Sequence, residues 1–419
     1  MRSIVLSLVI FLLMSWHNNA QEKWTCYTDD KLLLMDDYRT LGVFEYKDGS
    51  LWMITDRGIN IFDGEGWKKI DNKSDTMNKS ISSYLVDSKN RVWVGSNQYA
   101  YYGPAFLHKF NDGVVLYDGN EWKSMRTMDM GFKAPVVTRM FESKNGDIWL
   151  GVSSKLSGAE IGSVFAKAAL LRFSNEEWTV YKAKDMPCYR CEFVKSFYED
   201  DNGRLYFFAQ EGLYYFEDGS FHRVTKDDGY NLKSWPNTMF LDSKKNLWAG
   251  GIARIAKYNG KEWNSFNRKN GLPSADWPPI GFSETTDGKI IMTARNGLFH
   301  YDNSGQWEQE RIKFLTGNTY IDSQNRFWIS HNKGLMIKDG EETTTHKDIR
   351  MVWATLQDKA GGVWALSRKD GVKRLKDGQW QSFNKDNQLP SNRIRSGYVA
   401  NDGKVWIATN KGVCSCEYD

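Results

Sequence analysis

One phrase of about two dozen residues recurs along this chain, and it constrains the fold more than any other feature. Its clearest copy is GGVWALSRKDGVKRLKDGQWQSF at residues 361–383. The phrase predicts three short strands joined by turns, with Trp364 in the centre of the first strand. Both turns contain Asp-Gly, which favours tight hairpins because Gly tolerates a positive φ. A chain built from such units is expected to fold as a series of small antiparallel sheets.

The phrase recurs nine times when its copies are aligned on the central residue. That position is held, in chain order, by Trp52, Trp93, Trp149, Tyr206, Trp248, Ile291, Trp328, Trp364 and Trp406. The copies lie 36 to 57 residues apart, and a strand-rich period near forty residues is typical of β-propeller blades. We therefore predict an all-β fold, a single β-propeller of four-stranded blades. The count gives nine blades, with eight as the alternative, and the central aromatics should pack between neighbouring blades.

Two further residue types keep a fixed distance from the central residue. An Asp lies six residues before it in five units, at Asp87, Asp200, Asp242, Asp322 and Asp358. A Gly lies six residues after it at Gly58, Gly212, Gly297, Gly334 and Gly412. One carboxylate per turn is too few for a hard cation, which needs six to eight oxygen ligands. Asp at the start of a turn bonds the backbone ahead of it, so we predict a structural role and expect no metal site or cofactor.

The last unit stops after its third strand, and the N-terminal region is predicted to supply the fourth. KWTCY at 23–27 matches QWQSF at 379–383, so a strand at about 22–28 should close the ring. In the complete unit the hairpin places Lys373 opposite Ser382, and their counterparts are Cys414 and Cys26. Directly opposed strand residues have Cβ atoms ~4.5–5.5 Å apart, near disulfide range. We predict a Cys26–Cys414 disulfide, with Cys416 as the alternative partner.

The N-terminus predicts export. Residues 1–20 have the pattern of a signal peptide, with Arg2, an apolar stretch at 4–14 and Ala20 before the cleavage point, and 21–419 would form the propeller. We expect a periplasmic or secreted protein with no integral membrane segment after removal of the signal. Export permits disulfides. Cys188 and Cys191 lack the further ligands of a zinc site, so a local disulfide or an exposed thiol is expected there. The net charge of +4 does not indicate nucleic-acid binding.

Function is expected where the units differ. Two insertions, at 97–112 and 153–167, both join the second and third strands of adjacent blades. The first insertion carries residues suited to stacking on a sugar or an apolar ligand, although they could instead pack onto the propeller: Tyr99, Tyr101, Tyr102, Phe106 and His108. The corresponding turns of other blades carry basic residues that would circle one mouth of the channel, either binding an anionic ligand or simply being solvated: Arg57, Arg254, Arg295, Lys333, Lys369 and Lys411.

Catalytic signatures are sparse. The sequence has no H-x-x-x-H, no G-x-S-x-G and no phosphate-binding loop. We predict a binding module for an acidic oligosaccharide or a partner protein rather than an enzyme, and we assign no catalytic residue. A polysaccharide lyase or another carbohydrate-active enzyme is the alternative, with His108 and a nearby Arg as its acid–base and charge-neutralising groups. A structural scaffold without a small ligand is the second alternative.

The repeated phrase resembles the two-component regulator propeller repeat. GSLWMITDRGINIFDG, KNLWAGGIARIAKYNG, NRFWISHNKGLMIKDG and GKVWIATNKGVCSCEYD carry the resemblance, together with the linkers at 270–277 and 387–394. The resemblance implies a propeller that acts as a periplasmic sensor in hybrid two-component systems and responds to glycans. This sequence shows no kinase or DNA-binding segment after Trp406. We therefore expect any signalling role to require a separate partner protein.

Overall fold

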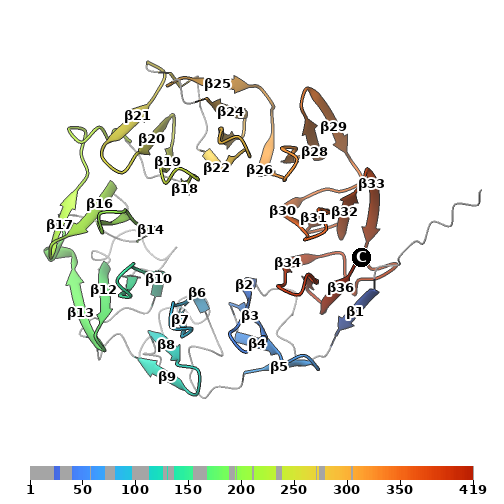
Figure 1. Cartoon of the computed structure of the whole chain (residues 1–419), viewed down its shortest axis with the longest axis horizontal. Helices are drawn as coiled ribbons and strands as arrows, with labels where there is room; N and C mark the ends of the chain where they lie inside the picture. Colours follow the sequence, from blue (N-terminus) through green and yellow to red (C-terminus); the bar gives the residue numbers. More distant parts are fainter. Residues whose placement is uncertain are drawn as a thin grey trace, which may run out of the picture.

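The computed structural model describes residues 23–28, 40–56, 58–70, 81–96, 113–125, 130, 136–153, 168–187, 194, 196–209, 212–232, 238–269, 271–272, 279–302 and 305–418. Within these residues the chain forms nine four-stranded antiparallel sheets. Figure 1 shows the sheets as the blades of a ring around a central channel. The predicted nine-bladed propeller is therefore confirmed. Within the same ranges the chain has no helix with the length and apolar character that a membrane span requires.

Each blade consists of strands A, B, C and D, counted from the channel outward. The strands of each blade are given in the order A to D. Blade 1 contains β2 (Thr40–Glu45), β3 (Leu51–Thr55), β4 (Gly58–Phe62) and β5 (Trp67–Lys69), and blade 2 contains β6 (Ile81–Val86), β7 (Val92–Ser96), β8 (Val114–Tyr117) and β9 (Trp122–Met125). Blade 3 contains β10 (Val136–Glu142), β11 (Ile148–Ser153), β12 (Ala168–Ser174) and β13 (Glu177–Lys182). A 3-10 helix (η2, Ala183–Asp185) follows β13.

Blade 4 contains β14 (Ser196–Glu199), β15 (Leu205–Ala209), β16 (Gly212–Glu217) and β17 (Ser220–Arg223). Blade 5 contains β18 (Thr238–Leu241), β19 (Leu247–Gly251), β20 (Arg254–Tyr258) and β21 (Trp263–Phe266). Blade 6 contains β22 (Pro279–Glu284), β23 (Ile290–Ala294), β24 (Gly297–Tyr301) and β25 (Trp307–Glu310). Blade 7 contains β26 (Leu315–Ile321), β27 (Phe327–His331), β28 (Gly334–Asp339) and β29 (Glu342–His346). Blade 8 contains β30 (Val352–Gln357), β31 (Val363–Ser367), β32 (Val372–Lys376) and β33 (Gln379–Phe383). Blade 9 contains β34 (Ile394–Val399), β35 (Val405–Thr409), β36 (Val413–Glu417) and β1 (Lys23–Tyr27).

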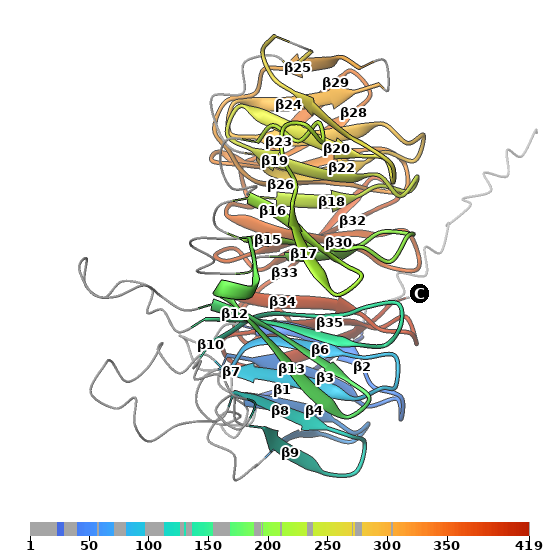
Figure 2. The same ribbon diagram turned by 90° about the vertical axis from the view of Figure 1, so that its left-hand side faces the viewer.

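The strands run from one face of the ring to the other (Figure 2). Because neighbouring strands are antiparallel, the B–C turns and the D–A connections meet on one face, which we call the B–C face. The A–B and C–D turns lie on the opposite face, the A–B face. The A strands are the innermost in Figure 1 and line the channel.

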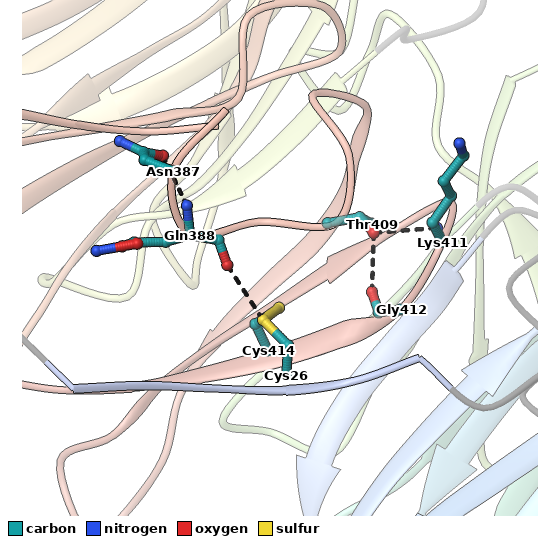
Figure 3. Close-up of a disulfide and its surroundings, with 7 residues drawn as sticks. All are labelled: Cys26, Asn387, Gln388, Thr409, Lys411, Gly412 and Cys414. Carbon is teal, nitrogen blue, oxygen red and sulfur yellow. Dashed lines mark hydrogen bonds between the residues drawn. A yellow bond between two sulfur atoms is a disulfide. The ribbon is translucent and has the colours of Figure 1, made fainter. Parts of the chain in front are cut away.

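The N-terminal strand closes the ring. Strand β1 pairs with β36 as the outermost strand of blade 9, with Cys26 directly opposite Cys414. These two residues form the predicted disulfide, which is confirmed (Figure 3). The carbonyl oxygen of Gln388, in the connection leading to blade 9, lies 3.3 Å from Cys26 Sγ. Cys416, the alternative partner, is a buried thiol in the same strand. Strand β1 covers the edge of β36, which would otherwise be unpaired, and an unpaired strand edge invites aggregation.

The core lies between the blades rather than in one centre. The described buried apolar side chains form nine clusters, one in each gap between neighbouring blades. All nine central residues of the repeated phrase are buried, as predicted. Burying ~150–250 Å² per aromatic side chain contributes roughly 4–6 kcal/mol of transfer free energy at ~25 cal/mol per Å². The repeated central residue is therefore a large apolar contact from one blade to the next.

The repeated spacing from Asp to the central aromatic has a structural reason. Asp358 Oδ2 accepts a hydrogen bond from Trp364 Nε1 at 2.7 Å, and Asp358 Oδ1 accepts one from the backbone N–H of Gly362 at 2.7 Å. Asp87, Asp242 and Asp322 bind their Trp indoles in the same way. One carboxylate thus fixes the A–B turn and satisfies a buried N–H. The structural interpretation of these Asp residues is correct.

Neighbouring blades are also tied together on the A–B face. The carboxylate of Glu284, the last residue of β22, accepts hydrogen bonds from the backbone N–H of Ser243 at 2.7 Å and from Ser243 Oγ at 2.6 Å. Glu45 accepts the backbone N–H of Asn401 at 3.0 Å, so the same contact joins blade 1 to blade 9. The ring is thus closed by this hydrogen bond as well as by the disulfide.

Candidate functional site

The B–C face is held together by backbone hydrogen bonds between its turns and connections. In blade 7 the N–H of Asn332 donates to the carbonyl oxygen of Phe314 at 3.2 Å. In blade 8 the N–H of Arg368 donates to the carbonyl of Met351, also at 3.2 Å. The D–A connections that lead to blades 7 and 8 are thereby fixed to the B–C turns of those blades. Side chains that project from this face stand on a rigid base, which favours precise presentation to a ligand.

Glycine is required where the B–C turns of blades 7 and 8 enter strand C. A Cβ on Gly334 would lie 2.2 Å from the carbonyl oxygen of His346, and one on Gly371 would lie 2.3 Å from that of Phe383. Gly371 also has a φ of 83°. The repeated Gly thus lets the C strand pass close to the end of strand D. This contact sets the position of the residue just before the Gly, which in blades 7 and 9 is the basic residue of the turn.

Four of the predicted basic residues are exposed in these turns: Arg295, Lys333, Lys369 and Lys411. Lys411 follows Thr409, whose hydroxyl accepts the N–H of Lys411 at 3.0 Å and donates to the carbonyl of Gly412 at 2.9 Å (Figure 3). Within the described ranges, Lys333, Lys369 and Lys411 make no ion pair. Their charges are therefore available to a ligand.

Arg254 differs from the other basic residues. It is partly buried at the start of β20, and its Nη1 donates to the carbonyl oxygen of Asn231 at 2.9 Å. Asn231 belongs to the connection that leads from blade 4 to blade 5, so this guanidinium ties the two blades together. The sequence alone could not show that contact, because the two residues lie in different repeats.

Asp370 reduces the positive charge of the face at one point. Arg350 donates to both of its oxygens, with Nη2 at 2.7 Å from Oδ1 and the backbone N–H at 2.7 Å from Oδ2. Burial raises the pKa of this carboxyl, but the hydrogen bonds from Arg350 outweigh burial and lower the pKa below its usual value. The charge of Arg350 is thus offset by Asp370, while neighbouring Lys369, whose charge also lowers the pKa of Asp370, makes no ion pair among the described residues.

A pocket of about 450 Å³ lies along the channel wall of blades 5 to 8. Its lining combines aromatic and aliphatic side chains with hydroxyl groups: Phe240, Phe282, Ser283, Glu284, Thr319, Tyr320, Ile321, Ser330, Trp353, Ala354 and Thr355. Trp353 occupies a bulge near the start of β30, and the Arg368 guanidinium lies 5.5 Å from the centre of its ring. An exposed indole beside hydroxyls and a cation can stack on a ring and bind its polar substituents.

Sequence reasoning missed Trp353. The sequence did contain a signal for it. Trp353 follows the first buried residue of an A strand, and the equivalent bulge position holds polar residues in other blades, Ser82 in blade 2 and Arg395 in blade 9. A Trp outside the repeated phrase was thus a departure from the pattern that the alignment could have shown.

The remaining predicted ligand-binding residues lie outside the described residues. These are Arg57, Tyr99, Tyr101, Tyr102, Phe106 and His108. Almost all of the two insertions also lies outside the described residues, as do Cys188 and Cys191, for which the sequence predicts a local disulfide or an exposed thiol. The strands that flank the insertions are described, and they place both insertions at B–C connections of blades 2 and 3. In the ranges that the structure describes, no three His, Cys, Asp or Glu side chains lie close enough together to hold a metal ion.

No family model and no curated protein matches the sequence. Among solved structures, the chain is similar to the extracellular domain of a hybrid two-component system from B. thetaiotaomicron, with 14% identity and a TM-score of 0.39 over 90% of this chain and 56% of that one. It is also similar to virginiamycin B lyase from Staphylococcus aureus, with 11% identity and a TM-score of 0.43 over 95% of this chain and 100% of that one. A third similar structure is PorZ, a surface component of the type-IX secretion system of Porphyromonas gingivalis, with 14% identity and a TM-score of 0.40 over 90% of this chain and 68% of that one.

The chain thus spans little more than half of the first of these domains. At 11–14% identity and TM-scores of 0.39–0.43, the similarities assign neither a family nor an activity.

Proposed function

We propose that this protein is an exported β-propeller that binds an acidic ligand on its B–C face, with an acidic oligosaccharide as the ligand class. The observation that carries this proposal is the set of exposed lysines at one end of the channel. Lys333, Lys369 and Lys411 occupy the turns of three consecutive blades and make no ion pair within the described ranges. Converging positive charge raises the local concentration of an anionic ligand.

The channel pocket supports an oligosaccharide as the ligand. Its hydroxyl groups and the exposed face of Trp353 suit a sugar ring, which presents apolar C–H groups on its faces and hydroxyls at its edge. The insertions of blades 2 and 3 start from the same face, so Tyr101 and its neighbours would contribute further stacking surfaces. Export is supported by the Cys26–Cys414 disulfide, since disulfides persist in oxidising compartments.

A thermal-shift screen with neutral and uronate-containing oligosaccharides tests the proposal. A ligand at ~100-fold excess over its Kd stabilises the folded protein by about 2.7 kcal/mol. We expect a rise in Tm with uronate-containing oligosaccharides only, reduced by Lys333→Ala with Lys369→Ala and separately by Trp353→Ala. Lys244→Ala is the matched control, because Lys244 is exposed on the A–B face.

The other possible results of the thermal-shift screen would each support a different function. Equal shifts with neutral sugars would contradict the role of the lysines. Unsaturated or shortened products after incubation would assign the protein to the lyase alternative. No shift with any oligosaccharide would contradict the proposal and favour a partner protein as the ligand.

A further inference from the structure

Large apolar side chains are exposed on the B–C face of blades 7 and 8. Phe314 is 59% exposed, Met351 is 58% exposed and Trp353 is 37% exposed. Phe314 and Met351 occupy equivalent positions, since each immediately precedes the first residue of an A strand. We call these three side chains the blade 7–8 patch. Large exposed apolar side chains gathered on one face of neighbouring blades mark an interaction site more often than single scattered ones do.

The backbone holds Phe314 and Met351 in a strained conformation. Their φ angles are 65° and 52°, in the left-handed region that bulky residues seldom adopt. Gly or Asn would fit these positions with less strain, because they tolerate left-handed geometry. Strain of this kind persists where the surrounding structure enforces it and is concentrated at functional sites. The hydrogen bonds from Asn332 and Arg368 to the two carbonyls enforce it here.

Positive charge surrounds the blade 7–8 patch. Lys333 and Lys369 belong to the turns that hold Phe314 and Met351, and both are exposed. Arg368 lies against Trp353, 5.5 Å from the ring centre. A partner for this surface must bury three apolar side chains and bring negative charge to the edge. A sugar could stack on Trp353, but its hydroxyls would be poorly matched to Phe314 and Met351.

We propose that the blade 7–8 patch is a docking site for a partner protein, which binds it through an acidic segment carrying apolar side chains. Rigidly held Phe, Met and Trp side chains would enter the partner as anchors, as the few dominant residues of protein interfaces do. The surrounding lysines and Arg368 would steer the acidic segment and fix its orientation. Docking here shares Trp353, Lys333 and Lys369 with the oligosaccharide binding proposed above. It differs in its dependence on Phe314 and Met351, which do not line the channel pocket.

Selection from a random dodecapeptide phage library on the immobilised full-length protein tests this proposal. We expect enriched peptides that combine Asp or Glu with aromatic or aliphatic residues. In fluorescence anisotropy their affinity for the Phe314→Asn, Met351→Asn double variant should fall at least about tenfold. Leu241→Asn is the matched control, since Leu241 is 42% exposed at the A–B end of β18 and should leave binding unchanged.

Two further measurements separate docking from a structural role. The Asn double variant should keep or raise the Tm, because Asn relieves the left-handed strain, while a lower Tm with lost binding would show that the side chains serve the fold. Binding should weaken from about 50 to 500 mM salt as exposed charges are screened.

The proposal would be overturned by failure to enrich any peptide, by enrichment of basic peptides, or by equal binding to the double variant. A dimer in sedimentation that the double variant abolishes would assign the patch to a second copy of this chain instead. Oligosaccharide shifts that survive in the double variant would show that the two sites are independent, and loss of those shifts would show that the patch belongs to the oligosaccharide site.

Discussion

Replacing Cys26 and Cys414 with Ala should destabilise the propeller by an amount set by the length of chain that the disulfide closes. The two residues are 388 positions apart in the sequence. The chain-entropy relation, −2.1 − 1.5R ln n, then gives about −20 cal/mol/K, or about 6 kcal/mol at 25 °C. With an unfolding entropy of about 2.1 cal/mol/K per residue over 419 residues, this corresponds to a fall in Tm of about 7 °C.

The chain offers a matched control for this estimate. Lys373 and Ser382 are the blade 8 equivalents of Cys414 and Cys26 and face each other in the same way, but they are only nine residues apart. A Lys373→Cys, Ser382→Cys pair, introduced into the variant that lacks the native disulfide, would close a short loop. The same relation gives about 2.6 kcal/mol for that loop. The native bond should therefore stabilise the protein about twice as much as the engineered one.

The assay is urea unfolding of each protein with and without a reducing agent, followed by circular dichroism. The reducing agent should lower the midpoint of the wild type and of the engineered variant, and leave the Cys26→Ala, Cys414→Ala variant unchanged. Hydrogen exchange should show that β1 opens first in that variant, because it is held only by its ladder with β36 and by packing such as Trp24 on Phe383. Equal stabilisation by the long and the short loop would refute the entropic reasoning.

Three other perturbations follow from the contacts described. Asp358→Ala should cost about 3–5 kcal/mol in urea unfolding, because it leaves the buried Arg374 guanidinium without its carboxylate, and a loss under about 1 kcal/mol would contradict this. Burial lowers the pKa of His300 although Glu310 opposes the shift, so the unfolded state binds the proton more readily and stability should fall as pH drops below about 6.5. His300→Phe should reduce that pH dependence of the urea midpoint, with the remainder coming from His346, whose pKa burial also lowers, and an unchanged slope would refute the assignment. Glu45→Ala and loss of the disulfide should add to within about 0.5 kcal/mol in a double-mutant cycle, because the Asn401 contact on the A–B face shares no partner with Cys26 and Cys414, whereas a larger coupling would contradict this.

The sequence predicted the architecture because the architecture is repetitive and local. Each blade is a run of hairpins whose turns depend on nearby Asp and Gly residues, and each central aromatic fills a gap to the next blade. Counting from one copy of the phrase placed Cys26 opposite Cys414 across 388 residues, since register within a strand pair follows from position in the repeat. The ring closure was therefore predictable from spacing alone.

The candidate site was only partly predictable. The repeat placed Lys333, Lys369 and Lys411 on one face, because every B–C turn lies at the same end of its blade. Spacing could not show that Arg254 bonds Asn231 of another repeat. The roles of the insertion aromatics and of His108 stay predictions, since these residues lie outside the described ranges.

The sequence by itself thus predicted nine blades, the register and the Cys26–Cys414 disulfide, which depend on contacts within one blade or between neighbours at a fixed offset. The structure excluded the alternatives of eight blades and of Cys416 as the partner. The tertiary structure alone decided the channel pocket and the blade 7–8 patch. The pocket exists because A strands from four different blades converge on one wall of the channel. The patch exists because hydrogen bonds to the B–C turns hold Phe314 and Met351 in a left-handed conformation that turns them toward solvent. Apolar residues beside a buried strand would otherwise be expected in the core, and only their backbone geometry shows that they are exposed.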